Sequence, residues 1–328
     1  MLPLVALLMI AGCSSPADPG ADSTPTTPEA SSSGTSSPAT QEAAPSVDVG
    51  DGPVGLAAGA GSVWSVTAQG EQLVRIDAKS AEASDPTDAG STPLRTTYAD
   101  HSVWVTSFGD GMVLRVDPSD GTILDSLRVG DGPEGITGAF GSIWVVAQDS
   151  GELVQIHPFP AQVVRRIKIG DGARLVTAGP DALYVAQFND DRVLKVDPRS
   201  GTVVRSAKLC SGPQGMAVTD GRLWVACTFA DKVVAVDLHS LKKVAQVDVP
   251  GSPDPVAIGP GGDVLVGAED GPTLVTIDPK SAEVTDQLKL GDDPALSDSA
   301  NIDLVVAAGQ AWVSAFRSGR VYHVPVGD

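Results

Sequence analysis

Short apolar runs separated by turn residues fill most of the chain, and residues 130–169 show this pattern most completely. After a Gly-Asp-Gly-Pro turn, apolar runs alternate with Gly-, Asp- and Pro-rich turns. Runs of this kind predict β-strands joined by tight turns. The predicted strands cover residues 135–138, 142–147, 152–157 and 162–169. We therefore expect one antiparallel meander of four strands.

The same pattern recurs at intervals of 40 residues. One aromatic residue marks the second predicted strand of five successive units: Trp64, Trp104, Trp144, Tyr184 and Trp224. The third predicted strand ends, in all but one of these units, on an aspartate: Asp77, Asp117, His157, Asp197 and Asp237. A proline follows the glycine-rich turn in all but one: Pro53, Pro93, Pro133, Ala173 and Pro213. Three marks with one period indicate a repeat architecture of the propeller or solenoid kind.

Two further units are less regular. Leu265 and Asp278 take the Trp and Asp places in the sixth unit, and Trp312 and Pro325 take them in the seventh, which has extra residues between 294 and 310. No stretch shows the 3.6-residue apolar period of an amphipathic helix. Seven four-stranded units match a β-propeller. A linear solenoid would need polar end caps, which the sequence does not show.

The two ends of the repeat region predict ring closure. The last unit stops after its third strand at 321–324, whereas residues 47–49 align with the end of a fourth strand at 127–129. The N-terminal strand should therefore complete the last blade and remove its open edge. We predict an all-β fold over residues 46–328, a seven-bladed β-propeller of four-stranded antiparallel blades closed by the N-terminal strand.

The repeat unit resembles that of a known family. The strings VGDGPEGI at 129–136 and IWVV at 143–146 resemble the YVTN-repeat β-propellers, the YncE-like group. The resemblance covers about residues 47–328, and it implies the propeller fold. Because the family is known mainly from surface or exported proteins, it also implies export, but it implies little about activity.

The net charge argues against a nucleic-acid partner. The chain has a formal charge of −19. The repeat region itself carries about −15, which repels phosphate backbones whose binding needs Lys and Arg. An acidic surface of this kind serves solubility.

The N-terminus has the pattern of a bacterial lipoprotein. An apolar run ends in Ile10-Ala11-Gly12-Cys13, which looks like a lipobox. The run is too short for a transmembrane helix. We expect a signal peptide at 1–12, a lipidated Cys13, and a disordered Ser/Thr/Pro/Ala tether through residue 45. The expected location is the extracytoplasmic face of the cell membrane. The alternative is a buried N-terminal strand.

The signal-peptide interpretation has one irregularity. A signal peptide should open with Lys or Arg, yet the first basic residue is Arg75. Either the true start lies upstream of Met1, which we favour, or the signal is weak.

The residue after each turn proline varies while the scaffold repeats. In a propeller these turns surround the central channel on one face. The position is occupied in turn by Val54, Leu94, Glu134, Arg174, Gln214, Asp254 and Ala295. Arg95 adds a second cation beside this set. We expect Arg95, Glu134, Arg174, Gln214 and Asp254 to form a site for a small ligand with charged and apolar parts. The alternative is an ordinary solvated rim.

The turns between the second and third strands open on the same face. They carry four of the six phenylalanines: Phe108, Phe188, Phe229 and Phe316. These rings form either a recognition rim or packing between blades. The same turns are rich in acids such as Glu269 and Asp270. Acidic turn chemistry explains these residues better than calcium binding, because no calcium-loop motif is present.

The remaining cysteines and the histidines complete the candidate chemistry. Cys210 and Cys227 should lie at the same end of one sheet, where a disulfide would staple blades 4 and 5 together, and two buried thiols are the alternative. The four histidines do not converge with a carboxylate pair or a serine nucleophile. We therefore expect no metal site, no cofactor and no catalytic residues.

Two functions remain open. The first is a monomeric, non-catalytic scaffold that binds a small molecule or a cell-envelope protein. The second is a lyase resembling virginiamycin B lyase, which would need a His and a Glu with Mg²⁺ at the channel mouth. Glu134 is available there, but no histidine stands in the Pro-x-Gly turns. A quinoprotein-type redox propeller has no cofactor motif to support it.

Overall fold

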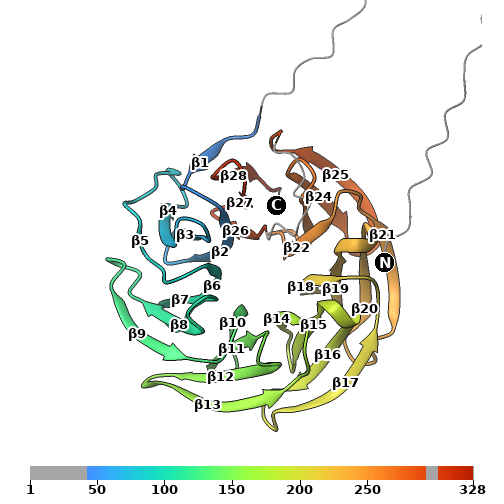
Figure 1. Ribbon diagram of the computed structural model, residues 1–328. Coiled ribbons are helices and arrows are strands. Elements are labelled where there is room, and N and C mark those ends of the chain that lie inside the picture. The colour runs from blue at the N-terminus through green and yellow to red at the C-terminus, as the bar shows by residue number, and fades with distance from the viewer. Residues whose placement is uncertain (1–42, 293–301, 328) are drawn as a thin grey trace, which may run out of the picture. The chain divides into compact units, whose positions relative to one another are not determined.

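Seven four-stranded sheets surround a central axis as blades (Figure 1). The computed structural model describes residues 43–292 and 302–327, which belong to one compact unit, Glu42–Asp328. All strand pairs within the blades are antiparallel, for example β10 with β11 and β11 with β12. The predicted seven-bladed propeller is confirmed. The signal peptide, Cys13, Ala295 and most of the tether lie outside the described residues.

Blade 3 shows how closely the local pattern set the strands. It consists of β10 (Pro133–Ala139), β11 (Ser142–Ala147), β12 (Glu152–Pro158) and β13 (Ala161–Lys168). The inner strand β10 begins two residues earlier than predicted, at the turn proline itself. Proline has no backbone N–H, so it is tolerated as the first residue of an edge strand such as this one.

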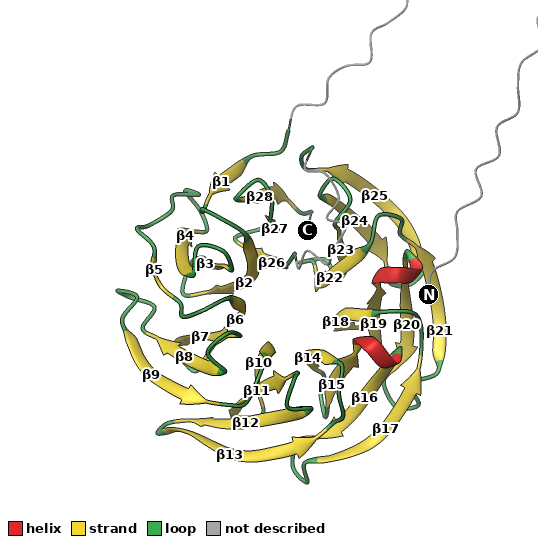
Figure 2. Cartoon of the chain, viewed as in Figure 1, coloured by secondary structure: helices red, strands yellow, loops and turns green. Residues whose placement is uncertain are grey.

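The other blades repeat this arrangement (Figure 2). Blades 1 and 2 are formed by β2 (Pro53–Gly59), β3 (Ser62–Thr67), β4 (Gln72–Asp77), β5 (Thr87–Asp88), β6 (Pro93–Ala99), β7 (Ser102–Ser107), β8 (Met112–Val116) and β9 (Ile123–Arg128). Blades 4 and 5 are formed by β14 (Ala173–Ala178), β15 (Leu183–Gln187), β16 (Arg192–Asp197), β17 (Thr202–Lys208), β18 (Pro213–Thr219), β19 (Arg222–Cys227), β20 (Lys232–Asp237) and β21 (Lys243–Asp248). Blades 6 and 7 are formed by β22 (Pro253–Ile258), β23 (Val264–Ala268), β24 (Thr273–Asp278), β25 (Glu283–Lys289), β26 (Leu304–Ala307), β27 (Gln310–Ala315), β28 (Arg320–Pro325) and the N-terminal β1 (Ser46–Asp48).

The seventh blade is closed by the N-terminal strand, as predicted. Its strand order is β1-β28-β27-β26, and β1 lies beside β28 at the outer edge (Figure 1). Val47 pairs with Val321 in the antiparallel ladder. The backbone bonds from His323 N to Pro45 O (2.9 Å) and from Val49 N to Gly319 O (2.9 Å) extend the pairing on both sides. In blade 7, β28 is therefore paired on both sides, and β1 takes the place of the outer fourth strand.

The hydrophobic core lies between blades rather than inside them. Trp144 of β11 is fully buried, and its cluster includes Leu183 and Leu194 of blade 4. In the same way Trp104 packs with residues of blade 3 and Trp224 with residues of blade 6. Trp312 joins blade 7 to blade 1. The residue that marks the 40-residue period is thus the contact between each blade and the next.

The aspartate at the end of the third strand stabilises the turn that follows. Asp117 Oδ1 accepts hydrogen bonds from Ser119 N (2.8 Å) and Ser119 Oγ (2.6 Å), and these bonds hold the pKa of Asp117 below its usual value. In blade 3, His157 Nδ1 accepts from Phe159 N (3.2 Å) at the same spacing. His157 therefore replaces the aspartate as a turn acceptor, and its place in the repeat is structural.

Glycine in the Pro-x-Gly turns lets neighbouring inner strands approach one another. A Cβ at Gly135 would lie 2.5 Å from the carbonyl oxygen of Arg174, and one at Gly215 would lie 2.0 Å from that of Asp254. A side chain cannot be accommodated at such distances. The close approach brings the varying residues of successive blades into direct contact.

The described residues include two helices, η1 (Phe188–Asp190) and η2 (Thr228–Ala230), each a single 3₁₀ turn (Figure 2). Within residues 43–292 and 302–327 no helix combines the length and the apolar character needed to cross a bilayer.

Replacing Trp312 with alanine tests the blade-to-blade core. Because Trp312 is fully buried between blades 7 and 1, Trp312→Ala should lower the free energy of unfolding by about 3–5 kcal/mol. Denaturant titration measures this change. Val244→Ala, on the exposed face of β21, is the control and should change stability by about 0.5 kcal/mol or less. Equal effects of the two substitutions would contradict the assignment.

Candidate functional site

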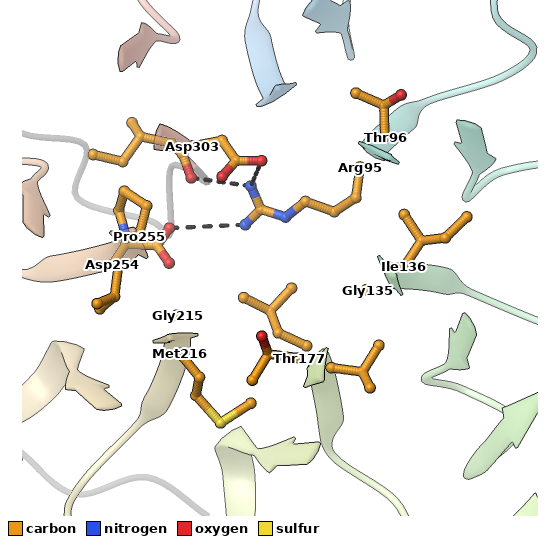
Figure 3. A pocket seen from close by; sticks show the side chains of 14 residues that line it. Arg95, Thr96, Gly135, Ile136, Thr177, Gly215, Met216, Asp254, Pro255 and Asp303 are labelled. Carbon is orange, nitrogen blue, oxygen red and sulfur yellow. Dashed lines mark hydrogen bonds and ion pairs between the residues drawn. The ribbon is translucent and has the colours of Figure 1, made fainter. Parts of the chain in front are cut away.

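The inner strands enclose a cavity of about 130 Å³ at the centre of the ring (Figure 3). Six of the seven blades contribute to its wall. The apolar part of the wall consists of Ile136, Leu175, Val176, Met216, Val256 and Ile302. The polar part includes Thr96 and Thr177 together with three charged residues, Arg95, Asp254 and Asp303. The cavity thus combines a charged side with an aliphatic side.

The five residues predicted to form a ligand site come together around this cavity. They are buried rather than spread along a solvated rim: the exposed fraction is 1% for Glu134, 2% for Gln214, 0% for Asp254 and 5% for Arg95, and 13% for Arg174. Only Arg95 and Asp254 line the cavity itself. The alternative of an ordinary solvated rim is therefore wrong for these positions.

Glu134, Arg174 and Gln214 form one hydrogen-bonded row across blades 3 to 5. Arg174 donates from Nε to Glu134 Oε2 (3.0 Å) and from Nη2 to Glu134 Oε1 (2.8 Å). Its Nη1 donates to Gln214 Oε1 (3.0 Å). The guanidinium also lies over the Phe188 ring, 4.9 Å from the centroid. Two-pronged, charge-assisted bonds of this kind fix Arg174 in one orientation.

Arg95 reaches from β6 across the channel to blades 6 and 7 (Figure 3). Its Nη1 donates to Ile302 O (3.0 Å) and lies 3.6 Å from Asp303 Oδ2, and its Nη2 lies 3.9 Å from Asp254 Oδ2. Asp303 is held by the backbone N–H of Leu56, which donates to its Oδ2 (2.9 Å). The Arg95 guanidinium thus sits between two carboxylates without a regular hydrogen bond to either.

Asp254 is the least satisfied polar group at the cavity. Its side chain is completely buried. Among the described residues neither of its carboxylate oxygens accepts a hydrogen bond of regular geometry, and Arg95 Nε likewise has no acceptor. Buried polar groups in proteins are nearly always paired. The orphaned oxygens of Asp254 therefore call for a functional explanation.

Burial perturbs the acidity of this group. Removal from water raises the pKa of Asp254 to about 6, although Arg95, Arg174 and the side chain of Gln214 oppose that shift. Burial also raises the pKa of Asp303, against the opposing charge of Arg95. Carboxylates with raised pKa values cluster at functional sites.

A second carboxyl group stands close by. Glu269, in the turn between β23 and β24, has its pKa raised to about 9 by burial and by the charge of Asp254, with Arg174 and Arg95 acting in the opposite direction. Glu269 is therefore neutral near pH 7, which lets it lie near Asp254 without repulsion between two charges.

The sequence interpretation missed Asp303 and did not include Glu269 in the site. It assigned the varying position of the seventh repeat to Ala295, which is wrong: Leu304 pairs with Val313 as Ile136 pairs with Val145. Counting two residues back from Leu304 and from Ile136 shows that Ile302 holds the position in the seventh repeat that Glu134 holds in the third. The cause is the long insertion in that repeat. Counting ten residues back from Trp312 instead of forward from Pro294 would have found Ile302 and, next to it, Asp303.

The phenylalanines of the companion turns rest on the turn glycines. A Cβ on Gly52 would lie 3.0 Å from the Phe316 ring, one on Gly132 would lie 3.1 Å from Phe108, and one on Gly212 would lie 2.9 Å from Phe229. Phe229 also meets Phe188 edge to face, with ring centroids 5.0 Å apart, and remains 68% exposed. The four rings therefore pack on the connections between successive blades, and of the four only Phe229 is largely open to solvent.

A disulfide joins Cys210 and Cys227, with Cα atoms 5.8 Å apart. Cys210 lies in the connection from β17 to β18, and Cys227 ends β19 opposite Pro213. The bridge thus ties the connection between blades 4 and 5 directly beside Gln214. A disulfide stabilises a fold mainly by restricting the unfolded chain, so this bridge favours the folded arrangement around Gln214.

The described part of the chain contains neither a cluster of metal ligands nor a histidine at the cavity. Within residues 43–292 and 302–327 no three His, Cys, Asp or Glu side chains are arranged to hold a metal ion. None of the described histidines lines the channel cavity. His323 instead stacks on Trp312 and bonds to Gln310 at the seam blade.

Replacing Glu269 with glutamine tests this half-buried carboxyl group. Because the folded-state pKa of Glu269 lies above the unfolded value, the folded protein retains a proton that the unfolded chain loses between about pH 5 and pH 9. Glu269 therefore makes the protein less stable as the pH rises through this window. Glu269→Gln should raise the melting temperature at pH 8 and flatten its decline, whereas Glu283→Gln on the exposed strand β25 should not. Identical pH slopes in wild type and Glu269→Gln would contradict the assignment.

No protein-family model and no curated protein sequence matches the chain. Solved structures do share its fold. A catalytically inactive virginiamycin B lyase from Staphylococcus aureus with quinupristin has a TM-score of 0.73 and 16% identity, over 86% of this chain and 99% of that one. A streptogramin B lyase has a TM-score of 0.71 and 14% identity, over 84% and 93%. Hydrazine synthase of Kuenenia stuttgartiensis has a TM-score of 0.67 and 15% identity, over 84% and 96%. At these identities the similarity establishes the propeller fold alone.

Proposed function

We propose that this chain is a non-catalytic binding propeller that takes a small ligand into its central channel. The observation that carries the proposal is the carboxylate of Asp254, which is completely buried at the cavity wall and accepts no regular hydrogen bond from the described residues. Burying a charged group whose oxygens accept no regular hydrogen bond is costly, even with the Arg95 guanidinium 3.9 Å away. Such an arrangement is understandable where a bound molecule supplies the missing donors.

The composition of the cavity supports a small molecule as the ligand. Binding sites for small molecules combine mostly apolar walls with a few convergent polar groups. Here Ile136, Val176 and Met216 supply aliphatic surface, while Arg95 and Asp254 supply charge. The row of Glu134, Arg174 and Gln214 lies directly beside Asp254 and supports it without lining the cavity.

We further propose that the propeller, residues 46–328, is displayed on the extracytoplasmic face of the cell membrane. The support is the Ile-Ala-Gly-Cys sequence ending at Cys13 and the polar tether through residue 45. A lipidated Cys13 with two or more acyl chains would anchor the chain stably. The Cys210–Cys227 disulfide suits an oxidising compartment. The repeat resembles exported YncE-like propellers, and a monomer that binds a small molecule or an envelope protein fits this setting.

A lyase is the second candidate, favoured by the shared fold of virginiamycin B lyase and streptogramin B lyase. Such a reaction would draw on a channel-mouth histidine, a carboxylate and Mg²⁺. The described residues fit this poorly. Glu134 is already held by two bonds from Arg174, and the described histidines lie away from the cavity wall. We therefore place binding ahead of catalysis.

Filling the cavity tests the proposed binding site. Compounds that stabilise the wild-type protein in a thermal-shift screen of small metabolites should lose their effect in Val176→Phe, because the larger ring occupies the ligand's space. A compound present at 100 times its Kd stabilises by about 2.7 kcal/mol, which is readily detected. Leu288→Phe, which fills the separate cavity of about 210 Å³ between blades 6 and 7, is the matched control and should keep the response.

Circular dichroism establishes that both variants are folded. Stabilising compounds that act equally on wild type and Val176→Phe would overturn the channel as the site. Conversion of a streptogramin B by the purified protein with Mg²⁺ would overturn the non-catalytic assignment in favour of the lyase.

Replacing Cys13 with serine tests the anchor. Without the thiol no diacylglycerol can be attached, so Cys13→Ser should shift the protein from the membrane fraction to the soluble fraction. Immunoblotting of fractionated cells measures the distribution. Ser14→Ala, which leaves the thiol in place, should stay with the membrane. Membrane retention of Cys13→Ser would argue for a different means of attachment.

A further inference from the structure

We propose that the ligand of the central channel is a small organic cation with an aliphatic body, and that Asp254 is the counter-ion of its ammonium group. This inference rests on the proposed binding function and specifies its ligand class. It follows from the balance of charges at the cavity, from the geometry of Asp254 and from the chemistry of the opposite wall.

Negative groups outnumber positive groups around the channel. Four carboxyl groups meet there, namely those of Glu134, Asp254, Glu269 and Asp303, and because Glu269 is neutral near pH 7 three of them are negative. Two guanidinium groups, Arg95 and Arg174, face them. Like charges confined in a poorly solvated site repel one another strongly. A ligand with one positive charge would complete the balance, and an anion would worsen it.

Asp254 is the carboxylate to which neither guanidinium group donates a regular hydrogen bond. Arg174 directs two of its nitrogens to Glu134 and one to Gln214. Arg95 lies 3.9 Å from Asp254, outside hydrogen-bond distance, and bonds instead to Ile302 O. Asp303 accepts backbone N–H bonds from Leu56 and Leu304, whereas the two oxygens of Asp254 accept none of regular geometry. An ammonium group carries three donors and could serve both oxygens.

The aliphatic part of the cavity wall indicates that the rest of the ligand is apolar. Figure 3 shows Asp254 and Asp303 on one side of the cavity, with Ile136 across it and Met216 on the wall between them. A short alkyl chain placed against Ile136, Val176 and Met216 would be removed from water at no polar cost. A divalent metal ion is less suited, because both guanidinium groups are near and no three ligating side chains are grouped among the described residues.

The experiment uses n-butylammonium chloride as the probe on the full chain. We expect 20 mM of it to raise the melting temperature of the wild-type protein by about 2 °C or more. Equal concentrations of sodium butyrate, n-butanol and sodium chloride should have no such effect. Asp254→Asn keeps the shape of the side chain but removes its charge, so it should weaken the apparent affinity for butylammonium at least tenfold.

Asp286→Asn is the matched control. Asp286 is an exposed acid on β25 of the same blade, and its amide variant should respond as the wild type does. The response of the wild type should also weaken as the pH falls from 7.5 to 5, since Asp254, with a pKa of about 6 among Arg95, Arg174, Asp303 and Glu269, takes up a proton in that range.

Three results would overturn the inference. The first is a butylammonium response that persists in Asp254→Asn. The second is stabilisation by butyrate, or by butanol as strongly as by butylammonium, that disappears in Val176→Phe. This second result would leave the channel as a binding site for a different chemical class, so the proposed function would stand. The third is the absence of any response to butylammonium, and in that case the metabolite screen tests the binding function separately.

Discussion

Packing of one large side chain against the neighbouring blade is the interaction on which the rest of the structure depends. Each four-stranded sheet is too small to bury an apolar face alone, and each finds its cover in the next sheet along the chain. Trp144 packs against blade 4, Trp224 packs against blade 6 and Trp312 packs against blade 1. Each blade packs its large side chain against the next blade along the chain. The apolar face of the last blade is therefore covered only when that blade packs against the first.

The same constraint explains why so much of the fold could be predicted from the sequence. A residue that makes the blade contact must recur at the same place in every repeat, as do the turn glycine and the turn aspartate. These positions form a period that can be seen without any coordinates. Prediction failed where an insertion interrupted the period, which is why Ala295 was assigned to a place that Ile302 holds. The insertion precedes the inner strand of the seventh repeat, so counting forward from Pro294 lost the register, whereas counting back from Trp312 keeps it.

Only part of the candidate site could be named from the sequence, and its burial could not be predicted. Glu134, Arg174, Gln214 and Asp254 were identified because they vary where the scaffold repeats. Their burial and mutual bonding follow from the close approach of inner strands at Gly135 and Gly215, a three-dimensional effect between blades. Glu269 and Asp303 join them from another turn and from the interrupted repeat. Side chains from separate repeats thus make one charge network, which no single repeat could reveal.

The pairing of β1 with β28 sets the order of events during synthesis. Ser46 is made long before its partner Tyr322. The seam therefore cannot form until the strands of all seven blades have been made, and its entropic cost grows only slowly with the length of the loop that it closes. Until then, blade 7 has no outer strand and blade 1 lacks the cover of Trp312. The closed ring is therefore the last feature of the fold to form, after the strands of every blade are available.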